Sequence, residues 1–367
     1  MEFKEFKIED LFEVKTTKGL DEGKLTFSES GDYNFVGRTK KNNGIKGRIS
    51  KQSFDTNAKN TISVSQIGTI TACYQPEEWY GSQNMFCLAS KNELTKNKHL
   101  YFVAVLNAYL RQYANSGRSV YPTLTSLKNA KIQLPVTPSG EIDFDYIEQH
   151  IEKIEKQYIE KIALMLKASG LDNYQLTEEE KAVLKEEKEK KEFKIEDLWV
   201  VDDWVYGKDK KWKTQFDCPI EGSLPVISGQ TTNNGVKYYT SDNYSTNEVF
   251  EDCLTMTTRG ESGRVFYHPG KFLLANNVLV MKMPKYSKNV MLYLGTVIEK
   301  VCRSTNYSVY PTKDSLKTKT IFLPVTPTEE IDFDYMEKYI SAIIKTKIKN
   351  VVLEINKKLE LYKQTQN

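Results

Sequence analysis

An internal repeat constrains the fold of this chain more than any other feature of its sequence. The octapeptide Lys-Glu-Phe-Lys-Ile-Glu-Asp-Leu at residues 4–11 recurs unchanged at residues 191–198. Three further blocks recur in the same order, at residues 119–123 and 308–312, 134–138 and 323–327, and 141–146 and 330–335. Chance does not produce a collinear set of this kind. The chain is therefore a duplicated unit with a period of about 190 residues.

Between the repeated blocks the two halves diverge, apart from an Asn-Asn-Gly at residues 42–44 and 233–235. Segments rich in β-branched residues predict strands at residues 61–73, 224–228, 254–257 and 278–283. Apolar residues at helical spacing predict packing helices at residues 100–113 and 290–302. Matching frames around variable interiors indicate one mixed α/β scaffold that carries two different recognition surfaces. The alternative is neutral drift within a duplicated enzyme.

A long helix is predicted after each Asp-Phe-Asp-Tyr block. Apolar residues recur at steps of three or four from Ile147 to Met165 and from Met336 to Tyr362. At 1.5 Å per residue, a helix over residues 143–167 is roughly 37 Å long and one over 332–364 roughly 50 Å. Because such narrow apolar stripes need a partner stripe, we expect the two helices to pair with each other.

Residues 167–191 connect the halves. Gly170 is predicted to end the first long helix, and Thr177 with Glu180 resembles a capping box that opens a short charged helix to about Lys190.

The sequence thus predicts an α+β fold with pseudo-two-fold symmetry from the duplication. Two mixed α/β recognition domains are separated by two long antiparallel helices that form a coiled-coil spacer. The predicted boundaries are residues 1–140 for the first recognition domain, 141–190 for the central spacer helix and connector, 191–328 for the second recognition domain, and 329–367 for the C-terminal spacer helix.

Catalytic motifs are missing from the sequence. The five cysteines never form a CxxC pair, and the three histidines have no partner at metal-ligand spacing. We find no phosphate-binding loop, no HExxH, no cofactor fingerprint, and no methyltransferase or nuclease motif. We therefore expect no catalytic residue, no cofactor and no metal. No segment approaches the roughly 20 apolar residues that span a bilayer, and the charged N-terminus lacks a signal core. We expect a cytoplasmic protein that contacts no membrane.

Basic and polar residues interleaved with aromatics lie in both variable interiors. Lys and Arg can neutralise phosphates, and Arg, Asn and Gln can contact base edges. The candidate DNA-binding residues of the first half are Arg38, Lys40, Lys41, Asn42, Lys46, Arg48, Trp79, Gln83, Arg118 and Tyr121. Those of the second half are Lys211, Lys213, Gln230, Asn233, Lys237, Arg259, Arg264 and Tyr310. The alternatives are that the Asn-Gly loops are plain turns and that Gln83 leads into core.

With these features, the chain resembles the specificity (S) subunits of type I restriction–modification systems. The resemblance covers nearly the whole length and rests on the repeated openings at residues 6–11 and 193–198, the repeated Leu-Pro-Val-Thr-Pro closings, and the helix after each. It implies two target-recognition domains that read a two-part site in double-stranded DNA. It also implies two methyltransferase (M) subunits as partners, to which restriction (R) subunits add, and no catalytic site in the chain.

Two alternatives stay open at this point. The chain is somewhat short for that family, so it could serve a fused restriction–methylation (type IIB-like) enzyme instead. From another class of protein, it could be a coiled-coil scaffold whose heads bind protein. Salt-sensitive binding to duplex DNA would distinguish this last alternative.

Overall fold

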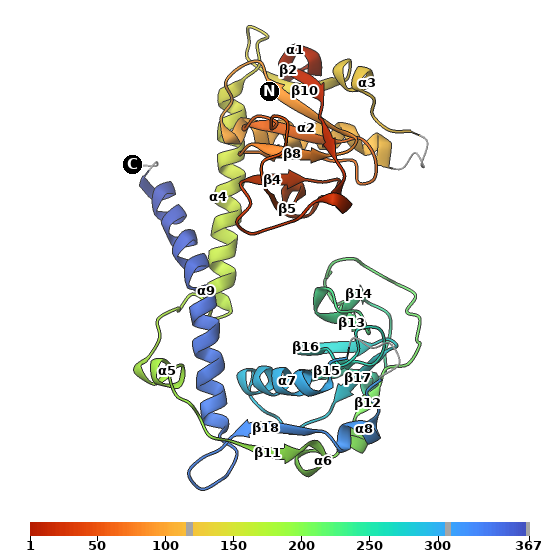
Figure 1. Cartoon of the computed structure of the whole chain (residues 1–367), viewed down its shortest axis with the longest axis vertical. Coiled ribbons are helices and arrows are strands. Elements are labelled where there is room, and N and C mark those ends of the chain that lie inside the picture. Colours follow the sequence, from red (N-terminus) through yellow and green to blue (C-terminus); the bar gives the residue numbers. More distant parts are fainter. Residues whose placement is uncertain (115–119, 305–309, 365–367) are drawn as a thin grey trace. The chain divides into compact units, whose positions relative to one another are not determined.

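A computed structural model describes residues 1–114, 120–304 and 310–364, and the chain forms two compact units. Unit 1 comprises Met1–Ile162 together with the C-terminal residues from Lys358, and unit 2 comprises Ala163–Lys357 (Figure 1). Each unit contains both strands and helices, and each is described here by itself.

Unit 1 begins and ends its globular part in one two-stranded ribbon. Strand β1 (Glu2–Lys7) pairs antiparallel with β10 (Lys131–Val136), so that Glu2 lies opposite Val136 and Lys7 opposite Lys131. Two four-stranded sheets follow, in the orders β2-β9-β6-β7 and β3-β8-β4-β5. Their strands are β2 (Phe12–Thr16), β3 (Gly19–Leu20), β4 (Tyr33–Val36), β5 (Ile45–Ile49), β6 (Thr61–Ser65), β7 (Ala72–Gln75), β8 (Trp79–Ser82) and β9 (Met85–Ser90).

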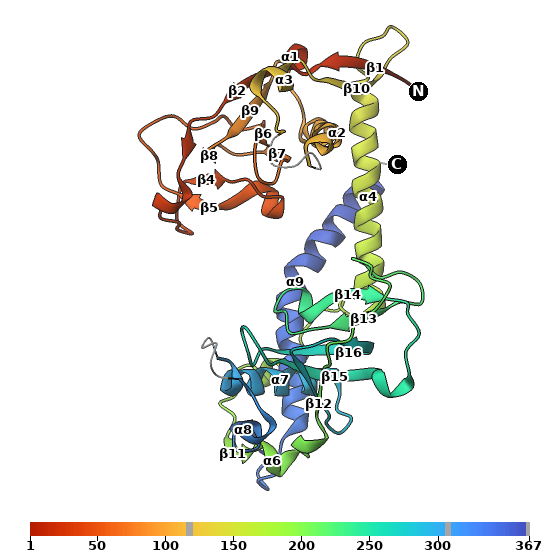
Figure 2. The same ribbon diagram turned by 90° about the vertical axis from the view of Figure 1, so that its right-hand side faces the viewer.

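Helix α2 (Lys96–Ala114) lies beside the β2-β9-β6-β7 sheet of unit 1, where Figure 2 shows it nearly end-on. Its buried Phe102, Leu106 and Leu110 join Val14, Leu88 and other strand residues in one hydrophobic core. The short helices are α1 (Ile8–Leu11) and α3 (Leu124–Lys128), with 3-10 turns η1 (Glu22–Lys24) and η2 (Lys41–Gly44). The helical spacing of apolar residues at 100–113 correctly predicted α2, which begins four residues earlier than expected.

Unit 2 also begins and ends its globular part in a two-stranded ribbon, but its other strands form one sheet instead of two. Strand β11 (Lys190–Lys194) pairs antiparallel with β18 (Thr320–Pro324), and one six-stranded sheet has the order β12-β17-β15-β16-β13-β14. Its strands are β12 (Val205–Tyr206), β13 (Leu224–Ile227), β14 (Val236–Thr240), β15 (Phe250–Thr257), β16 (Val265–Leu274) and β17 (Val278–Met281). The remaining elements are α5 (Glu178–Val183), α6 (Ile195–Leu198), η3 (Val201–Asp203), η4 (Asn233–Gly235), η5 (Thr246–Glu248), α7 (Lys288–Cys302) and α8 (Lys313–Lys317).

A long strand replaces two short ones in the sheet of unit 2. Strand β16 runs for ten residues and pairs antiparallel with β15 and, near its end, parallel with β13. In unit 1 the corresponding chain is broken between β7 and β8, and β8 makes the parallel pair with β4. Helix α7 packs on β16, and its Leu294 and Ile298 are fully buried in the core of unit 2.

Each unit also contains part of a long helix that follows an Asp-Phe-Asp-Tyr block. These are α4 (Phe144–Ala168) and α9 (Phe333–Gln364), within one residue of the predicted bounds. The carboxylate of Asp143 accepts the backbone N–H of Tyr146 at 2.9 Å, and Asp332 accepts that of Tyr335 at 2.8 Å. Both aspartates therefore cap their helices, and such caps typically stabilise a helix by about 1 kcal/mol.

Two sequence predictions of local structure were wrong in extent. The connector helix α5 ends at Val183 rather than near Lys190, because the following chain extends into strand β11, whose Lys190 pairs with Pro324. The capping box between Thr177 and Glu180 is present as predicted. The predicted strand over residues 61–73 is two strands, β6 and β7, joined by a turn.

Candidate nucleic-acid interface

A tight turn joins β4 to β5 in unit 1, and the repeated Asn-Asn-Gly forms it. Asn42 and Asn43 have φ of 46° and 52°, a left-handed conformation that asparagine adopts more readily than most residues. The Asn42 amide donates to the carbonyl of Ile45 at 3.2 Å, and the Asn43 amide donates to that of Tyr74. The Gln75 amide in turn donates to the Asn43 carbonyl at 3.1 Å. The turn is thereby fixed against strand β7.

The same turn joins β13 to β14 in unit 2. Asn233 and Asn234 both have φ of 51°, and the Asn233 amide donates to the carbonyl of Val236 at 3.2 Å. The Asn234 amide donates to the carbonyl of Tyr267 on β16 at 3.1 Å. The first asparagine of each pair was predicted to contact DNA, yet its side chain closes the turn. The repeated motif thus forms the same turn in both units and holds the neighbouring loop residues in place.

Three cations surround the turn of unit 1. Arg38, Lys40 and Lys41 are exposed, and within the described ranges of the chain no ion pair involves them. A groove of about 460 Å³ lies between this turn and helix α2. Lys40 and Arg111 line it together with Asn107. Arg111 was missed by the sequence analysis, although it is the basic residue in the last turn of α2.

Other residues predicted for the first half serve the fold. Trp79 is completely buried and its indole N–H donates to Thr61 at 3.0 Å, so it belongs to the core and the prediction for it was wrong. The Arg48 guanidinium donates to the carbonyls of Gly31 and Asp32, both at 2.8 Å, and pairs with Glu77 at 3.2 Å. Both side chains stabilise the β4–β5 region.

The remaining candidates of the first half differ in their surroundings. Lys46 pairs with Glu22 at 2.9 Å, with both side chains partly exposed. Gln83 and Tyr121 are exposed, so Gln83 is not a core residue. Arg118 lies outside the described residues.

Exposed cations also surround the loops of unit 2. Lys211, Lys213 and Lys237 are exposed, and the Lys237 ammonium lies 5.9 Å from the centroid of the Tyr238 ring. The Arg259 guanidinium lies over the Tyr310 ring at 5.3 Å, so the structure brings these two predicted residues together. Such a cation–π pair holds an arginine extended while leaving its N–H donors available.

Two cations and one amide of unit 2 already have partners within the protein. The Arg264 guanidinium pairs with Glu299 at 3.0 Å and is largely buried. The Gln230 amide donates to the carbonyl of Val236, inside the β13–β14 turn. A hydrogen bond from Lys210 is the main cause that lowers the pKa of Glu248 to about 2, so that this lysine is neutralised by its partner. Because of its pair with Glu299, Arg264 is a structural residue, and its prediction as a DNA-binding residue is corrected.

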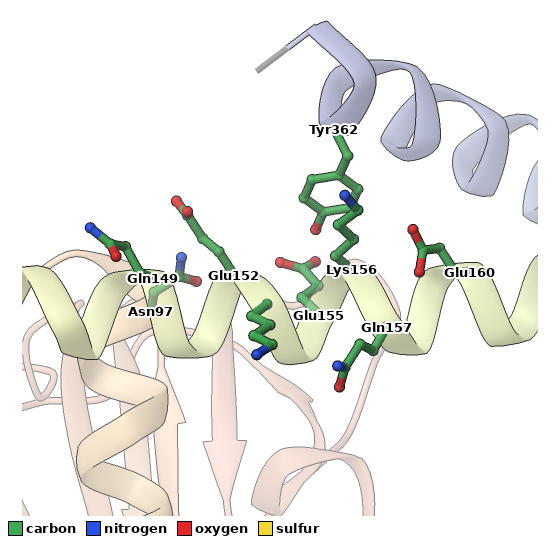
Figure 3. A pocket seen from close by; sticks show the side chains of 9 residues that line it. Asn97, Gln149, Glu152, Glu155, Lys156, Gln157, Glu160 and Tyr362 are labelled. Carbon is green, nitrogen blue, oxygen red and sulfur yellow. The ribbon is translucent and has the colours of Figure 1, made fainter. Parts of the chain in front are cut away.

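A further pocket among the described residues lies on the long helices rather than in a sheet. It measures about 650 Å³ and is lined by Asn97, by one face of α4 and by Tyr362, whose ring points toward Glu155 (Figure 3). A hydrogen bond from Lys358 lowers the pKa of Glu155, so this carboxylate is ionised and paired. The lining also includes Glu152 and Glu160 with Lys153 and Lys156, so its charges are mixed and it offers no basic cluster for phosphate.

The other histidine, cysteine and carboxylate groups of the described chain that stand out have structural roles. No group of three or more His, Cys, Asp or Glu in those residues could hold a metal ion. Burial lowers the pKa of His268 to about 4, and its ring nitrogen shares a hydrogen bond of 2.8 Å with the Thr255 hydroxyl in the core. None of the helices in the described ranges is both long and apolar enough to cross a membrane.

Comparisons with known proteins agree on one family. A family model described as "Type I restriction modification DNA specificity domain" matches residues 1–164 and 187–354. The chain is 25% identical over 347 residues to a protein of Heyndrickxia coagulans named "Type II restriction enzyme BgcI specificity subunit S.BcgI", and the match covers 92% of this chain and 94% of that protein. It is also similar in fold to the type I restriction–modification S subunit of M. genitalium, with a TM-score of 0.54 and 13% identity, covering 98% of this chain and 92% of that one.

Proposed function

The chain belongs to the type I restriction-modification DNA specificity family, and from this premise we propose which of its parts read DNA and how they are spaced. It is a specificity subunit, the non-catalytic recognition component of a restriction–modification complex. A protein-binding scaffold is therefore not favoured.

Each recognition domain is proposed to read one half of a two-part DNA site. Residues 1–140 form the first domain and residues 191–328 the second, with residues 141–190 and 329–367 as the spacer segments. The observation that carries this proposal is the shared turn: in both units the same fixed Asn-Asn-Gly turn lies among exposed cations. Two different loop surfaces on one frame suit the reading of two different half-sites.

The two long helices are proposed to pair antiparallel as the spacer between the domains. At 1.5 Å per residue, the 25 residues of α4 span roughly 37 Å and the 32 residues of α9 roughly 48 Å. One turn of DNA measures about 34–36 Å, so helices of this length suit two half-sites separated by base pairs that are not read.

The proposed DNA contacts are side chains exposed at the surface of the described chain. In the first domain they are Arg38, Lys40 and Lys41, with Lys46, Gln83 and Tyr121 as further candidates and Arg111 added from the groove. In the second they are Lys211, Lys213, Lys237, Arg259 and Tyr310. Cations near phosphates supply affinity for any sequence, whereas contacts to base edges supply specificity.

Partners follow from the family. We propose that the chain assembles with two methyltransferase subunits and with restriction subunits, in the cytoplasm where the DNA lies. The family model describes a type I domain, which favours separate subunits over the fused restriction–methylation alternative. The name of the Heyndrickxia relative assigns that protein to a type II enzyme, so the two arrangements need a direct test.

Reconstitution provides that test. The purified chain is mixed with the separately encoded methyltransferase subunit of its host and S-adenosylmethionine, and genomic DNA is then sequenced for methylated bases. We expect methylation at a two-part motif with the complete mixture and none with either protein alone. Methylation only when a fused restriction–methylation polypeptide replaces the methyltransferase would favour the alternative, and methyl transfer by the chain alone would contradict the proposal.

A further inference from the structure

In each unit, one glutamate of the long helix is held by two side chains from the start of the neighbouring helix. On α4 of unit 1, the Glu148 carboxylate accepts the Thr95 hydroxyl and, at 2.7 Å, the Asn97 amide. On α9 of unit 2, the Glu337 carboxylate accepts the Ser287 hydroxyl and, at 2.7 Å, the Asn289 amide. We call these two sets of three residues the latches.

The latches are repeated in the sequence as well as in the geometry. Thr95-Lys96-Asn97 corresponds to Ser287-Lys288-Asn289, and each glutamate follows its Asp-Phe-Asp-Tyr block by two residues. The tripeptide lies inside the interiors that otherwise diverge. Within this one chain, the second copy has kept a hydroxyl and an amide at the two positions that touch the long helix, while most of the surrounding residues changed.

An aromatic contact accompanies each latch. In unit 1, His150 stacks on Tyr146 at 5.4 Å and meets the edge of Tyr101 at 6.1 Å. In unit 2, Tyr339 stacks on Tyr335 at 5.7 Å and meets the edge of Tyr293 at 6.0 Å. The stacked pair of each unit flanks the latch glutamate along the long helix, and the edge-on tyrosine lies one turn beyond the latch amide.

The latch and the aromatic contact attach the neighbouring helix to the long helix at two separate points. Two such points fix the orientation of one helix on the other, whereas a single point would permit rotation. The hydroxyl of each latch also accepts a backbone N–H at the start of its helix, from Lys98 in unit 1 and from Val290 in unit 2. Each glutamate is thus tied to a helix terminus and not to a mobile side chain alone. Hydrogen bonds to an ionised carboxylate are about twice as strong as neutral ones, which gives the attachment its rigidity.

We propose that Glu148 and Glu337 are positioning residues that set the number of base pairs between the two half-sites. This inference rests on the proposed function. Adjacent base pairs differ by about 3.4 Å along the helix axis and by roughly a tenth of a turn around it. A recognition domain can therefore select one spacing only if its position and rotation on its own long helix vary by less than the step between adjacent base pairs. The latch and the ring contact hold it.

The test uses the full chain in complex with the methyltransferase subunit. The substrates are duplexes with both half-sites constant and the central spacer lengthened or shortened by single base pairs. We expect the wild type to methylate one spacing best. Glu148→Gln removes the charge and half of the acceptor capacity, and we expect methylation at the neighbouring spacings to rise by about tenfold relative to the best spacing. The half-site sequences should stay unchanged, and Glu337→Gln should behave alike.

A reversed latch serves as the rescue. Asn97→Asp alone places a second carboxylate against that of Glu148, and their repulsion should broaden the spacing profile. The double variant Asn97→Asp with Glu148→Gln restores an amide–carboxylate hydrogen bond in the opposite direction, and we expect it to restore one preferred spacing. Glu152→Gln, an exposed glutamate one turn along α4, is the matched control and should leave the profile as in the wild type.

The outcomes separate the latch from the rest of the function. A sharp, unchanged spacing profile in folded Glu148→Gln and Glu337→Gln overturns the inference while leaving the proposed function intact. Loss of half-site discrimination at constant spacing also overturns it. If Glu148→Gln fails to fold, Asn97→Ala tests the same contact from α2. A wild-type complex that methylates no two-part site overturns the proposed function itself, and the inference with it.

Discussion

Two arginines close in sequence show that the role of a cation depends on what surrounds it. Arg38 is exposed beside the β4–β5 turn, whereas Arg48 holds two backbone carbonyls and Glu77. The sequence predicted both as DNA contacts, because residue type alone does not reveal which carbonyls lie within reach. Trp79 and Arg264 were assigned wrongly because residue type also does not reveal burial in the core or a carboxylate partner such as Glu299. Exposed loop cations such as Lys40 and Lys211 were predictable, since no apolar pattern surrounds them.

Substituting these residues should separate binding from stability. We expect Arg38→Ala, Lys40→Ala and Lys41→Ala together to weaken binding to all duplexes and to reduce the slope of log affinity against log salt by about 1 for each phosphate that is no longer neutralised. Their free energy of unfolding should stay as in the wild type. Arg48→Ala should instead lower that free energy by about 2 kcal/mol, because the backbone carbonyls of Gly31 and Asp32 are then left without this donor. Fluorescence anisotropy at several salt concentrations and urea unfolding measure the two effects. Unchanged affinity of the triple variant would mean that the loop is only a turn.

A buried acid of the connector gives the stability of unit 2 a pH dependence. Burial alone would raise the pKa of Glu180, but hydrogen bonds from Lys345, Ser341 and the backbone of Thr177 outweigh it and hold the pKa at about 2. The pKa in the unfolded chain is about 4.3, so the folded state favours the ionised form. The stabilisation is therefore complete above about pH 5 and is lost as the pH falls through 4 toward 2.

Glu180→Gln should remove this contribution. We expect the variant to lose about 2–3 kcal/mol of unfolding free energy at pH 7, since Lys345 keeps a weaker partner. The difference from the wild type should shrink as the pH is lowered from 5 to 3. Urea unfolding curves at pH 7, 5, 4 and 3 measure it, with the exposed Glu178→Gln as control. A constant difference across this range would show that the carboxylate charge is not the cause.

At the scale of elements, turns and helix starts were predictable from local sequence, whereas contacts between distant segments were not. The repeated Asn-Asn-Gly forms a turn in both halves, which was the alternative left open for it, and the Asp-Phe-Asp-Tyr blocks correctly marked the starts of α4 and α9. The latches were not predicted, because the Thr-Lys-Asn and Ser-Lys-Asn at the starts of α2 and α7 are polar and carry no periodic apolar signal. The end of α5 was misplaced because the pairing of Lys190 with Pro324 is long-range and leaves no local trace.

The β4–β5 turn offers a test of left-handed backbone in this fold. Asn43→Ala puts alanine, which tolerates the left-handed region less well than asparagine, at a φ of 52° and removes the hydrogen bond to Tyr74, and we expect it to cost about 2 kcal/mol of unfolding free energy. Asn43→Gly keeps the backbone conformation and loses only the side-chain bond, so it should cost about half as much. Urea unfolding of the two variants measures the difference. Equal losses would show that the conformation itself contributes nothing.

For the whole molecule, the duplication predicts how a half behaves alone. Helix α4 exposes an apolar stripe of Ile154, Tyr158, Ile162 and Met165, spaced at three or four residues. Ile147, expected from the sequence to belong to this stripe, is buried within unit 1 instead. A fragment of residues 1–190 lacks the second half, and the simplest way to cover the stripe is a closed two-fold dimer of two fragments.

Light scattering gives the mass of that fragment in solution and so shows whether it forms a dimer. We expect a dimer at micromolar concentration, and Tyr158→Glu should shift it to monomer because a charge then lies in the paired stripe. With the methyltransferase subunit, the dimer should methylate a palindromic form of the first half-site. A well-folded monomeric fragment would contradict the helix pairing, and the spacer model would fall with it.

The ribbon formed by β1 and β10 has a practical consequence for protein engineering. Glu2 lies opposite Val136, so the chain enters and leaves the first globular domain at one place, and β11 with β18 does the same for the second. Everything between the paired strands can therefore be exchanged as a cassette without altering the distance between the two cut points. Because β1 and β11 share Lys-Glu-Phe-Lys, and β10 and β18 share an Ile and a Leu-Pro, a domain grafted from one position to the other would meet many of the flanking residues with which it already folds.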